Sequence, residues 1–531
     1  MNRAKFTNRF IHGAAASAAL FFGGCMVGPD YEQPTAPVEP TWKDSAAEQE
    51  DILEPVVPPT VKWWSESFHD PVLDDLIEQA LVNNYQLESA ALRVLQAQQR
   101  LAIAIGNEFP QQQQVTGGAS RQKSNGATFN NFNIGFNVGW ELDLWGRFRR
   151  EVLSAQANVD ASIAAYDGVL VSVASQVAQN YLLIRTFQQR LIVTRRNLEY
   201  QKESVRITQV KADIGAVTDL DVDQAQAIYY NTEALISGYE VSLQQFKNNL
   251  AILLGQPPGE FDYLLAEPEA IPLPPVEVGL GMPQDLIRRR PDIRVAERSM
   301  AAQSERIGVA FSELLPSITI GGGLGTAATD FNKLFANSNQ TWQLYGLFEW
   351  NVLNYGRLMN NVRLQDATFQ QLVSDYRQTV LSAQADVENA LIAYLKAHQQ
   401  MRSYEKSSSA SQRAVDLAQI QYEQGSIPFN TVINTLQSNL AQQDLLVASQ
   451  GSVGTNLVQL YLALGGGWEI REGVNPVEYL PESTVDAMQA RTGIWEHLVQ
   501  EDEAATGSAE DLAGDSVDES AAADDVLLEA F

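Results

Sequence analysis

The side chains that most often carry out chemistry are few in this 531-residue chain. Its four histidines, at positions 12, 69, 398 and 497, are far apart in sequence, and Cys25 is its only cysteine. A metal centre or a catalytic triad needs several such groups in one place. The glycine-rich run at 321–325 lacks the Gly-Lys-Ser/Thr that completes a phosphate-binding loop, and we expect it to form a thin strand. The sequence therefore predicts no enzyme and no metal or other cofactor.

Three aspartates, Asp219, Asp221 and Asp223, stand beside a glycine-containing turn at 213–219. If several copies of the chain surround one axis, each inward-facing carboxylate becomes a ring, which attracts cations and repels anions. Asp219 has a second interpretation, as the N-cap of the helix that follows. The pattern predicts a charged constriction at this turn.

Within the stretch from 131 to 147, residues 132–143 alternate strictly between two faces, one apolar and one without apolar side chains, which is typical of a strand with two different environments. A transmembrane β-strand needs such a pattern, with lipid on one side and water on the other. The alternative is a half-buried strand of a soluble sandwich. Trp140, Trp342 and Trp350 suit the aromatic girdle of a membrane interface, although a core role gives the same pattern. The predicted lipid-facing residues are Phe132, Ile134, Phe136, Val138, Trp140, Trp342 and Trp350.

The chain contains a tandem duplication with units of about 210 residues. Trp140 and the Trp-Gly-Arg at 145–147 are repeated as Trp350 and the Tyr-Gly-Arg at 355–357. Each unit predicts a helix, two strands, a very long helix, a sharp turn and a shorter helix. The first strand pair is expected at 113–120 and 131–143. The long helices are expected at 147–213 and 357–423, in proline-free stretches with an apolar residue every seven positions. The shorter helices, at 73–107, 220–254, 291–314 and 430–464, have about half that length, so we expect them to stack end to end beside the long ones.

The predicted organisation adds terminal segments and a linker to the two repeats. Residues 1–24 resemble a secretory signal, and Cys25 follows small residues, as at a bacterial lipidation site; a chance cysteine is the alternative. The net charge of −29 excludes a nucleic-acid partner. The sequence contains no apolar run of about 18 residues, so we expect no membrane-spanning helix. The predicted segments are a proline-rich, lipidated tether at 25–72, a first repeat at 73–255, a linker at 256–290, a second repeat at 291–465, a C-terminal segment at 466–499 and a disordered acidic tail at 500–531.

Four strands per chain cannot close a barrel, and open edges in lipid leave backbone groups unpaired. Two copies would give an eight-stranded barrel filled by its own side chains, whereas three give about twelve strands and room for a lumen. The predicted fold is therefore a mixed α and β membrane protein: a twelve-stranded barrel in a homotrimer, continued by a coiled-coil-like α-helical tunnel.

Several motifs together resemble the TolC/OprM-like family of outer-membrane efflux factors, in particular the NodT-type lipoproteins. They are the Cys-Met-Val-Gly-Pro-Asp-Tyr at 25–31, the Trp-Gly-Arg at 145–147, the Leu-Ile-Arg-Arg-Arg-Pro-Asp-Ile at 286–293 and the Tyr-Glu-Gln-Gly at 422–425. The resemblance covers residues 25–470. It implies a trimeric barrel and periplasmic tunnel in the outer membrane of a Gram-negative bacterium. It also implies a periplasmic adaptor and an inner-membrane pump, commonly of the RND class, that expel drugs, organic solutes or metal ions.

The same resemblance implies roles for individual residues. Asp221 matches a gating aspartate and Tyr422 a gating tyrosine, whereas Thr431 and Asn434 stand where relatives often carry further acids. We therefore expect a weakly acidic constriction. The two turns are expected to contact the adaptor; the alternative is that they are ordinary turns at the ends of helices. Their residues are Gly215, Ala216, Val217, Gly425, Ser426 and Ile427.

The leading functional hypothesis is a passive duct in a tripartite efflux system. A secretion duct for protein or polysaccharide would use the same fold. A non-conducting coiled-coil adhesin or spacer is the alternative from another class.

Overall fold

The computed structural model describes residues 26–38, 53–54, 61–124, 126–259, 265–275, 278–279 and 289–495. The predicted signal, the lipidated Cys25 and the acidic tail lie outside these residues. The chain divides into two compact units, and the second begins at Gly473. In the second unit, the described elements are a short 3₁₀ turn, Pro476–Tyr479, and the helix α11, Glu482–Thr492.

Two long helices dominate the first unit, and both have the bounds that the sequence predicts. They are α5, Arg147–Asp213, and α9, Arg357–Glu423, each of 67 residues. The seven-residue apolar repeat is buried along most of its length, with Val177, Ile184 and Val387 inaccessible to solvent, and it is half-buried at Leu198, Val205, Ala212 and Met401. One 18-residue window of α5, with mean hydropathy 1.3, is long and apolar enough to cross a membrane, but 56% of it is buried inside the chain, as in a core helix. The coiled-coil prediction is therefore confirmed for both helices.

The shorter helices complete the two repeats. They are α2, Trp63–Phe68; α3, Pro71–Asn83; α4, Tyr85–Gly106; α6, Asp219–Leu253; α8, Pro291–Ser312; and α10, Phe429–Leu464. The prediction of one continuous helix at 73–107 is wrong, because the chain is extended at Asn84. The Asn84 side chain accepts hydrogen bonds from the backbone N–H groups of Gln86 and Leu87, so it starts a new helix as an N-cap.

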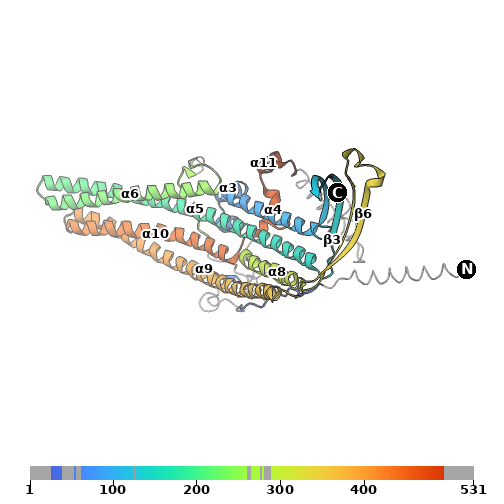
Figure 1. Ribbon diagram of the computed structural model, residues 1–531. Helices are drawn as coiled ribbons and strands as arrows, with labels where there is room; N and C mark the ends of the chain where they lie inside the picture. Colours follow the sequence, from blue (N-terminus) through green and yellow to red (C-terminus); the bar gives the residue numbers. More distant parts are fainter. Residues whose placement is uncertain are drawn as a thin grey trace, which may run out of the picture. The chain divides into compact units, whose positions relative to one another are not determined.

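The short helices stack end to end, as predicted from their lengths. Asn84 donates from its side-chain amide to the carbonyl of Leu253 at 2.8 Å, which joins the start of α4 to the end of α6. Arg290 donates to the carbonyl of Ala463 at 2.8 Å, which joins the start of α8 to the end of α10. Figure 1 shows α4 and α6 following one another along α5, and α8 and α10 following one another along α9.

The four long strands form one antiparallel sheet in the order β2-β3-β5-β6. Their bounds are β2, Gln112–Ser124; β3, Ala127–Glu141; β5, Ser317–Ala328; and β6, Gln340–Glu349. The first strand is therefore longer than the predicted 113–120. Pairing of β3 with β5 joins the hairpins of the two repeats. Two further short strands, β1, Leu53–Glu54, and β4, Val278–Gly279, pair in parallel.

The prediction of an extended tether at 25–72 is wrong for residues 63–68, which form helix α2, whereas residues 26–38 contain no helix or strand but are packed against the helices. Residues 26–38 lie along α5, α8 and α9, where Tyr31 donates to the Glu297 carboxylate at 2.9 Å and Gln384 donates to the carbonyl of Pro37 at 2.9 Å. Trp63 and Trp64 are each 1% exposed, and Trp63 stacks on Tyr461 with ring centroids 4.7 Å apart. Burial of these aromatic rings orders a stretch whose proline content alone suggests an extended chain.

Candidate functional site

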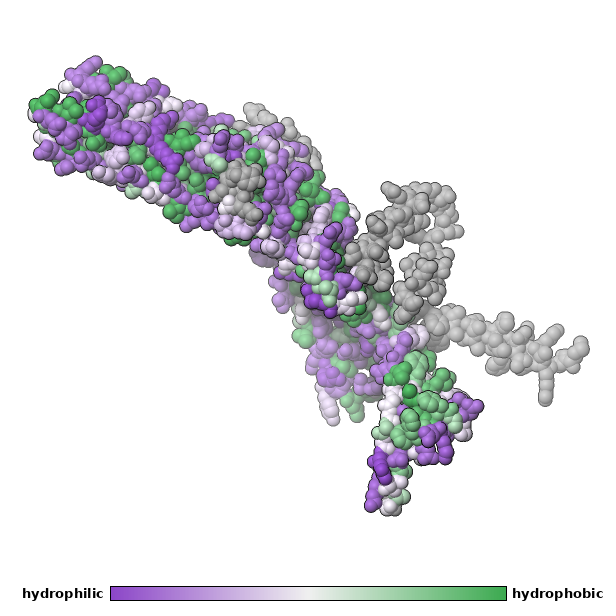
Figure 2. All heavy atoms as spheres, turned by 90° about the horizontal axis from the view of Figure 1, so that it is seen from above, coloured by the Kyte–Doolittle hydropathy of each residue, from purple (hydrophilic) through white to green (hydrophobic). Residues whose placement is uncertain are grey.

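The sheet carries one continuous apolar face. Val115 pairs with Phe136, Phe136 with Leu324, and Leu324 with Trp342, so one apolar row crosses all four strands. Phe132, Ile134, Val138 and Trp140 lie on the same face of β3, and Trp350 directly follows β6. This face is exposed, with Trp342 78% and Leu344 76% accessible. Figure 2 shows hydrophobic residues gathered over the sheet. In the described part of the chain, no second sheet covers this face, which disfavours the soluble sandwich.

The opposite face is polar and rich in glycine. Asn137 pairs with Gln114 and Gly323, and Gly323 pairs with Gln343. The Asn137 amide also donates to the Thr116 hydroxyl at 3.2 Å. Gly325 of β5 allows close strand packing, because a Cβ on it would lie 2.9 Å from the backbone carbonyl oxygen of Ile134. The run at 321–325 is therefore a thin strand, as predicted, and the sheet separates an apolar from a polar environment.

The two helical hairpins turn at the ends of α5 and α9 that lie away from the sheet (Figure 1). Gly215 and Gly425 have φ angles of 70° and 71°, the left-handed conformation that such a turn requires. Four of the six predicted contact residues are exposed, namely Gly215, Ala216, Gly425 and Ser426; Val217 and Ile427 are half-buried. Ile214, at 75% exposure, and Leu220, at 63%, add apolar surface to the first turn that was not predicted.

The acidic residues of the predicted constriction stand at the start of α6. Thr218, rather than Asp219, is the N-cap, so the N-cap interpretation of Asp219 is wrong. Asp221 accepts hydrogen bonds from the backbone N–H and the hydroxyl of Thr218, both at 3.1 Å, and completes a capping box. Thr218 and Asp221 thus share the capping of α6 that the sequence assigned to Asp219. Asp219, Asp223, Thr431 and Asn434 are exposed, and Asp221 is half-buried.

Tyr422 is buried in the chain, with 7% of its surface exposed. Its ring lies 5.2 Å from that of Phe429. Burial raises the pKa of the Tyr422 hydroxyl. Asp221 at the start of α6 and Tyr422 at the end of α9 thus both lie at the hairpin turns.

A small apolar core beneath the turns was not predicted as a unit. It combines residues of both hairpins, and its only signal in the sequence is the apolar repeat that continues to the helix ends. Its buried members are Ala225, Ile228, Val415, Ala418, Tyr422, Phe429, Val432, Ile433 and Leu436. This tip core, as we call it, packs the two hairpins against each other.

Near the sheet, Arg150 holds the N-terminal segment in place. It is 1% exposed and pairs with Glu305 at 2.8 Å and Asp30 at 2.9 Å. These bonds link α5 and α8 to residues 26–38. Gly28 lies so close to Gly308 that a Cβ on it would be 2.5 Å from the Gly308 Cα. We call residues 26–38 the N-terminal strap, because they cross both repeats. The strap was not predicted, because its partners are distant in sequence.

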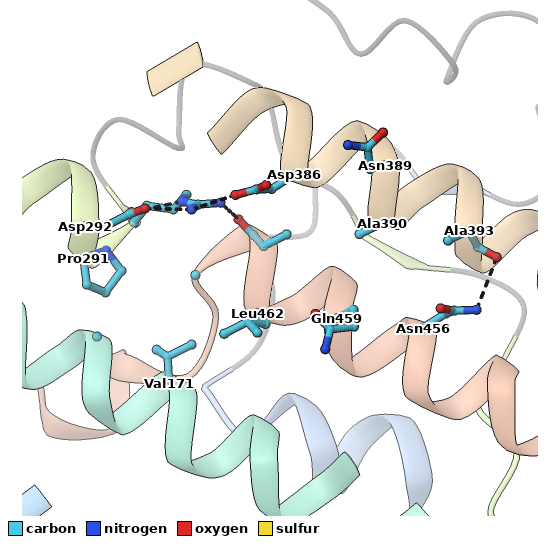
Figure 3. Close-up of a pocket in the computed structure, with 14 residues that line it drawn as sticks. Val171, Pro291, Asp292, Asp386, Asn389, Ala390, Ala393, Asn456, Gln459 and Leu462 are labelled. Carbon is cyan, nitrogen blue, oxygen red and sulfur yellow. Dashed lines mark hydrogen bonds and ion pairs between the residues drawn. The ribbon is translucent and has the colours of Figure 1, made fainter. Parts of the chain in front are cut away.

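A cavity of about 590 Å³ lies where α8 and α10 meet, between α5 and α9. Arg290 bridges it by pairing with Asp292 at 2.7 Å and Asp386 at 3.2 Å (Figure 3). Asn389, Asn456 and Gln459 supply further polar groups. No group of His, Cys, Asp and Glu with the geometry to hold a metal ion exists among the described residues.

Comparison with known proteins gives a consistent result over most of the chain. The family described as "Outer membrane efflux protein" matches residues 76–256 and 282–466. Nodulation protein T of Rhizobium leguminosarum bv. viciae is 28% identical over 90% of this chain and 97% of its own length. The toluene efflux pump outer membrane protein TtgC of Pseudomonas putida is 30% identical over 86% of this chain and 96% of its own. The solved outer-membrane channel OprN matches 84% of this chain and all of its own with a TM-score of 0.78 and 29% identity.

The fold described above is thus shared, over 84% of this chain, with a solved outer-membrane channel. The family match covers both repeats, from α3 into the linker and from the linker to the end of α10. On this evidence, the chain belongs to the outer membrane efflux protein family.

Proposed function

We propose that this chain is the outer-membrane channel of a tripartite efflux system in a Gram-negative bacterium. It would conduct small molecules passively from an inner-membrane pump, one of the RND class by family resemblance, through a periplasmic adaptor and out of the cell. The two-faced sheet that leads directly into long helices is the observation that carries the proposal. The relatives' names support it, since TtgC is described as part of a toluene efflux pump.

A homotrimer follows from the two open edges of the sheet. The outer edges of β2 and β6 have no partner strand in the described chain, and in lipid their backbone groups must be satisfied. Pairing β6 of one copy with β2 of the next closes a barrel, and three copies give about twelve strands. The apolar face then contacts lipid and the polar face lines the lumen.

The helices support the same arrangement. The main contacts of α5 are with α4, α6, α8 and α10, whereas those of α9 are with α8 and α10 alone. The other flank of α9 leaves Leu364 60% and Leu417 60% exposed. On the opposite edge, Tyr85 on α4 is 70% exposed and Tyr230 on α6 is 61% exposed. These two apolar edges would cover each other between neighbouring copies in a trimer.

The hairpin turns are proposed to contact the adaptor, and Asp221 and Tyr422 to narrow the entrance. Because Thr431 and Asn434 are uncharged, the entrance would select only weakly for cations. Cys25 is proposed as the lipid anchor. The first residues of the strap, which follow it, lie where the chain passes from the sheet into α5, and the Val27 N–H donates to the carbonyl of Trp145 at 3.1 Å.

Reconstitution of the purified protein into planar bilayers tests the proposal. We expect discrete conductance steps from trimers, and a monomeric protein without conductance would contradict it and favour the adhesin or spacer. Deletion of the gene, followed by a panel of drugs, dyes and metal salts, separates efflux from secretion. Unchanged sensitivity together with loss of a secreted polymer would favour a secretion duct.

A further inference from the structure

The two hairpin turns have the same backbone hydrogen bonds. In the first, Gly215 donates to the carbonyl of Ala212 and Ala216 to that of Lys211, both at 2.8 Å. In the second, Gly425 donates to the carbonyl of Tyr422 at 3.0 Å, and Ser426 to that of Gln421 at 2.8 Å. Any contact present at only one turn is therefore a departure from the internal symmetry.

Lys211 makes such a contact. Its Nζ donates to the backbone carbonyl of Tyr422 at 2.9 Å. The same ammonium lies 3.6 Å from the centroid of the Tyr422 ring, within the range of a cation–π interaction. Lys211 lies in the last turn of α5 and Tyr422 in the last turn of α9. One side chain thus joins the two hairpins through both the backbone and the ring.

The electrostatics of α9 explain why this cation is needed. The last carbonyls of a helix have no partner within it and carry partial negative charge, which a cation offsets. The last turn of α9 contains no basic residue, whereas that of α5 contains Lys211. The position equivalent to Lys211 in the second repeat is Gln421. Lys211 thus supplies the missing cation to the neighbouring hairpin.

Tyr422 is well placed to transmit this contact. It belongs to the tip core, where its ring packs on Phe429 at the start of α10. Thus Lys211 holds the end of α9 and, through Tyr422, the start of α10. A movement of the second hairpin away from the first must break the hydrogen bond and the ring contact together.

We propose that Lys211 is a latch that holds the second hairpin against the first and restrains opening at the tip. The proposal rests on the conducting role proposed above. It assigns Lys211 a positioning role, since the residue acts through Tyr422 rather than on the transported solute. Release of the latch would let the second hairpin move without unfolding either helix.

Planar-bilayer recordings of the full-length trimer test the latch. Lys211→Met removes the charge and keeps the length of the side chain, and we expect it to raise conductance or open probability about three- to tenfold. Lys202→Met is the matched control, because Lys202 is an exposed lysine on the same helix; it should behave like the wild type. Lys211→Arg keeps a cationic donor and should remain close to the wild type.

Hydrogen exchange on the same proteins gives a readout that does not depend on conduction. Peptides covering 415–436 should exchange faster in Lys211→Met than in the wild type or in Lys202→Met. Tyr422→Leu removes the ring from the other side, and combining it with Lys211→Met should add less than the sum of the single effects. If one of the two single variants assembles poorly, the other tests the same contact on its own.

The outcomes separate the latch from the proposed function. If the wild type does not conduct, the channel proposal fails; unchanged exchange in Lys211→Met would then overturn the latch as well, whereas faster exchange would support the hairpin contact. If the wild type conducts and Lys211→Met matches Lys202→Met, the latch alone is overturned. Faster exchange without a change in conductance also overturns it, because the contact would then be purely structural.

Discussion

The indole N–H groups of Trp140 and Trp350 make equivalent hydrogen bonds in the two repeats. Trp140 donates to the carbonyl of Glu108 at 3.1 Å, and Trp350 donates to the carbonyl of Leu314 at 3.0 Å. Each acceptor stands two residues before a proline, at the point where a helix passes into a strand. The two tryptophans therefore fix the angle between helix and sheet, in addition to any contact with lipid.

Substitution of either tryptophan should loosen this joint. Trp140→Phe and Trp350→Phe keep an aromatic ring and remove the N–H, so we expect each to lower stability by about 0.5–1.5 kcal/mol. Thermal unfolding of the detergent-solubilised trimer measures this change. Trp342→Phe is the control, because that ring is 78% exposed on the sheet. Equal effects at all three positions would mean that ring size, rather than the bond, matters.

Asp221 should influence both conductance and the start of α6. Asp221→Ala removes a carboxylate from the proposed constriction and should raise single-channel conductance and weaken any preference for cations. It also removes the capping-box acceptor, at a cost of about 1 kcal/mol. Asp221→Asn removes the charge but keeps an acceptor oxygen. If the two variants leave conductance and ion selectivity unchanged, Asp221 does not lie at the constriction.

Arg150 should be essential for docking of the N-terminal strap. Arg150→Met leaves Glu305, 11% exposed, without its cation, which should cost about 3–5 kcal/mol. Limited proteolysis should then cleave within residues 26–38, and the trimer should unfold at a lower temperature. Arg206→Met is the control, since Arg206 pairs with Glu203 on the exposed surface of α5. Equal protease resistance in both variants would contradict the role of Arg150.

His398 should make stability depend on pH. It is 6% exposed, neither ring nitrogen has a hydrogen-bond partner, and its ring packs edge-on to Tyr394 at 4.8 Å. Burial, followed by the charge of Arg402, lowers its pKa from the ordinary value of 6.5. The unfolded chain therefore binds the proton more tightly. Stability is full above pH 6.5 and falls as the pH drops from there towards the lower pKa of the folded state.

Melting temperatures between about pH 5 and 8 check this dependence. His398→Leu should reduce the slope below about pH 6.5. His69→Asn is the control, because His69 is exposed and has a φ of 49°, which asparagine tolerates. An unchanged slope in His398→Leu would assign the acid sensitivity to other groups.

Lipidation at Cys25 is a further prediction. Cys25→Ser should abolish incorporation of labelled palmitate and release part of the protein from the outer-membrane fraction. Metabolic labelling followed by fractionation measures both effects. Label that remains on the serine variant would place the lipid elsewhere.

The features that were predictable from the sequence are those with a local period. The seven-residue repeat that includes Val177 and Val387 needs no knowledge of the fold, and neither does the alternation around Phe136. The turns at Gly215 and Gly425 were predictable because few residues other than glycine adopt a positive φ. These signals also gave the correct bounds of α5 and α9.

The features that were missed depend on partners distant in sequence. Asp30 and Arg150 are 120 residues apart, so the composition of the strap suggested a tether. Lys211 and Tyr422 are 211 residues apart, and a lysine near a helix end is otherwise ordinary on a solvated surface. The break at Asn84 was hidden because the apolar pattern continues on both sides of it.

The end-to-end joints at Asn84 and Arg290 have a consequence for how the protein can change in length. An extra residue in the middle of α5 or α9 would rotate everything after it by about 100° around the helix axis and misalign the apolar seam. An insertion in the loop after α6 would leave both stacked helices in phase. Insertions that lengthen the helical part during evolution should therefore be concentrated at these joints, while the two uninterrupted helices keep a constant number of residues.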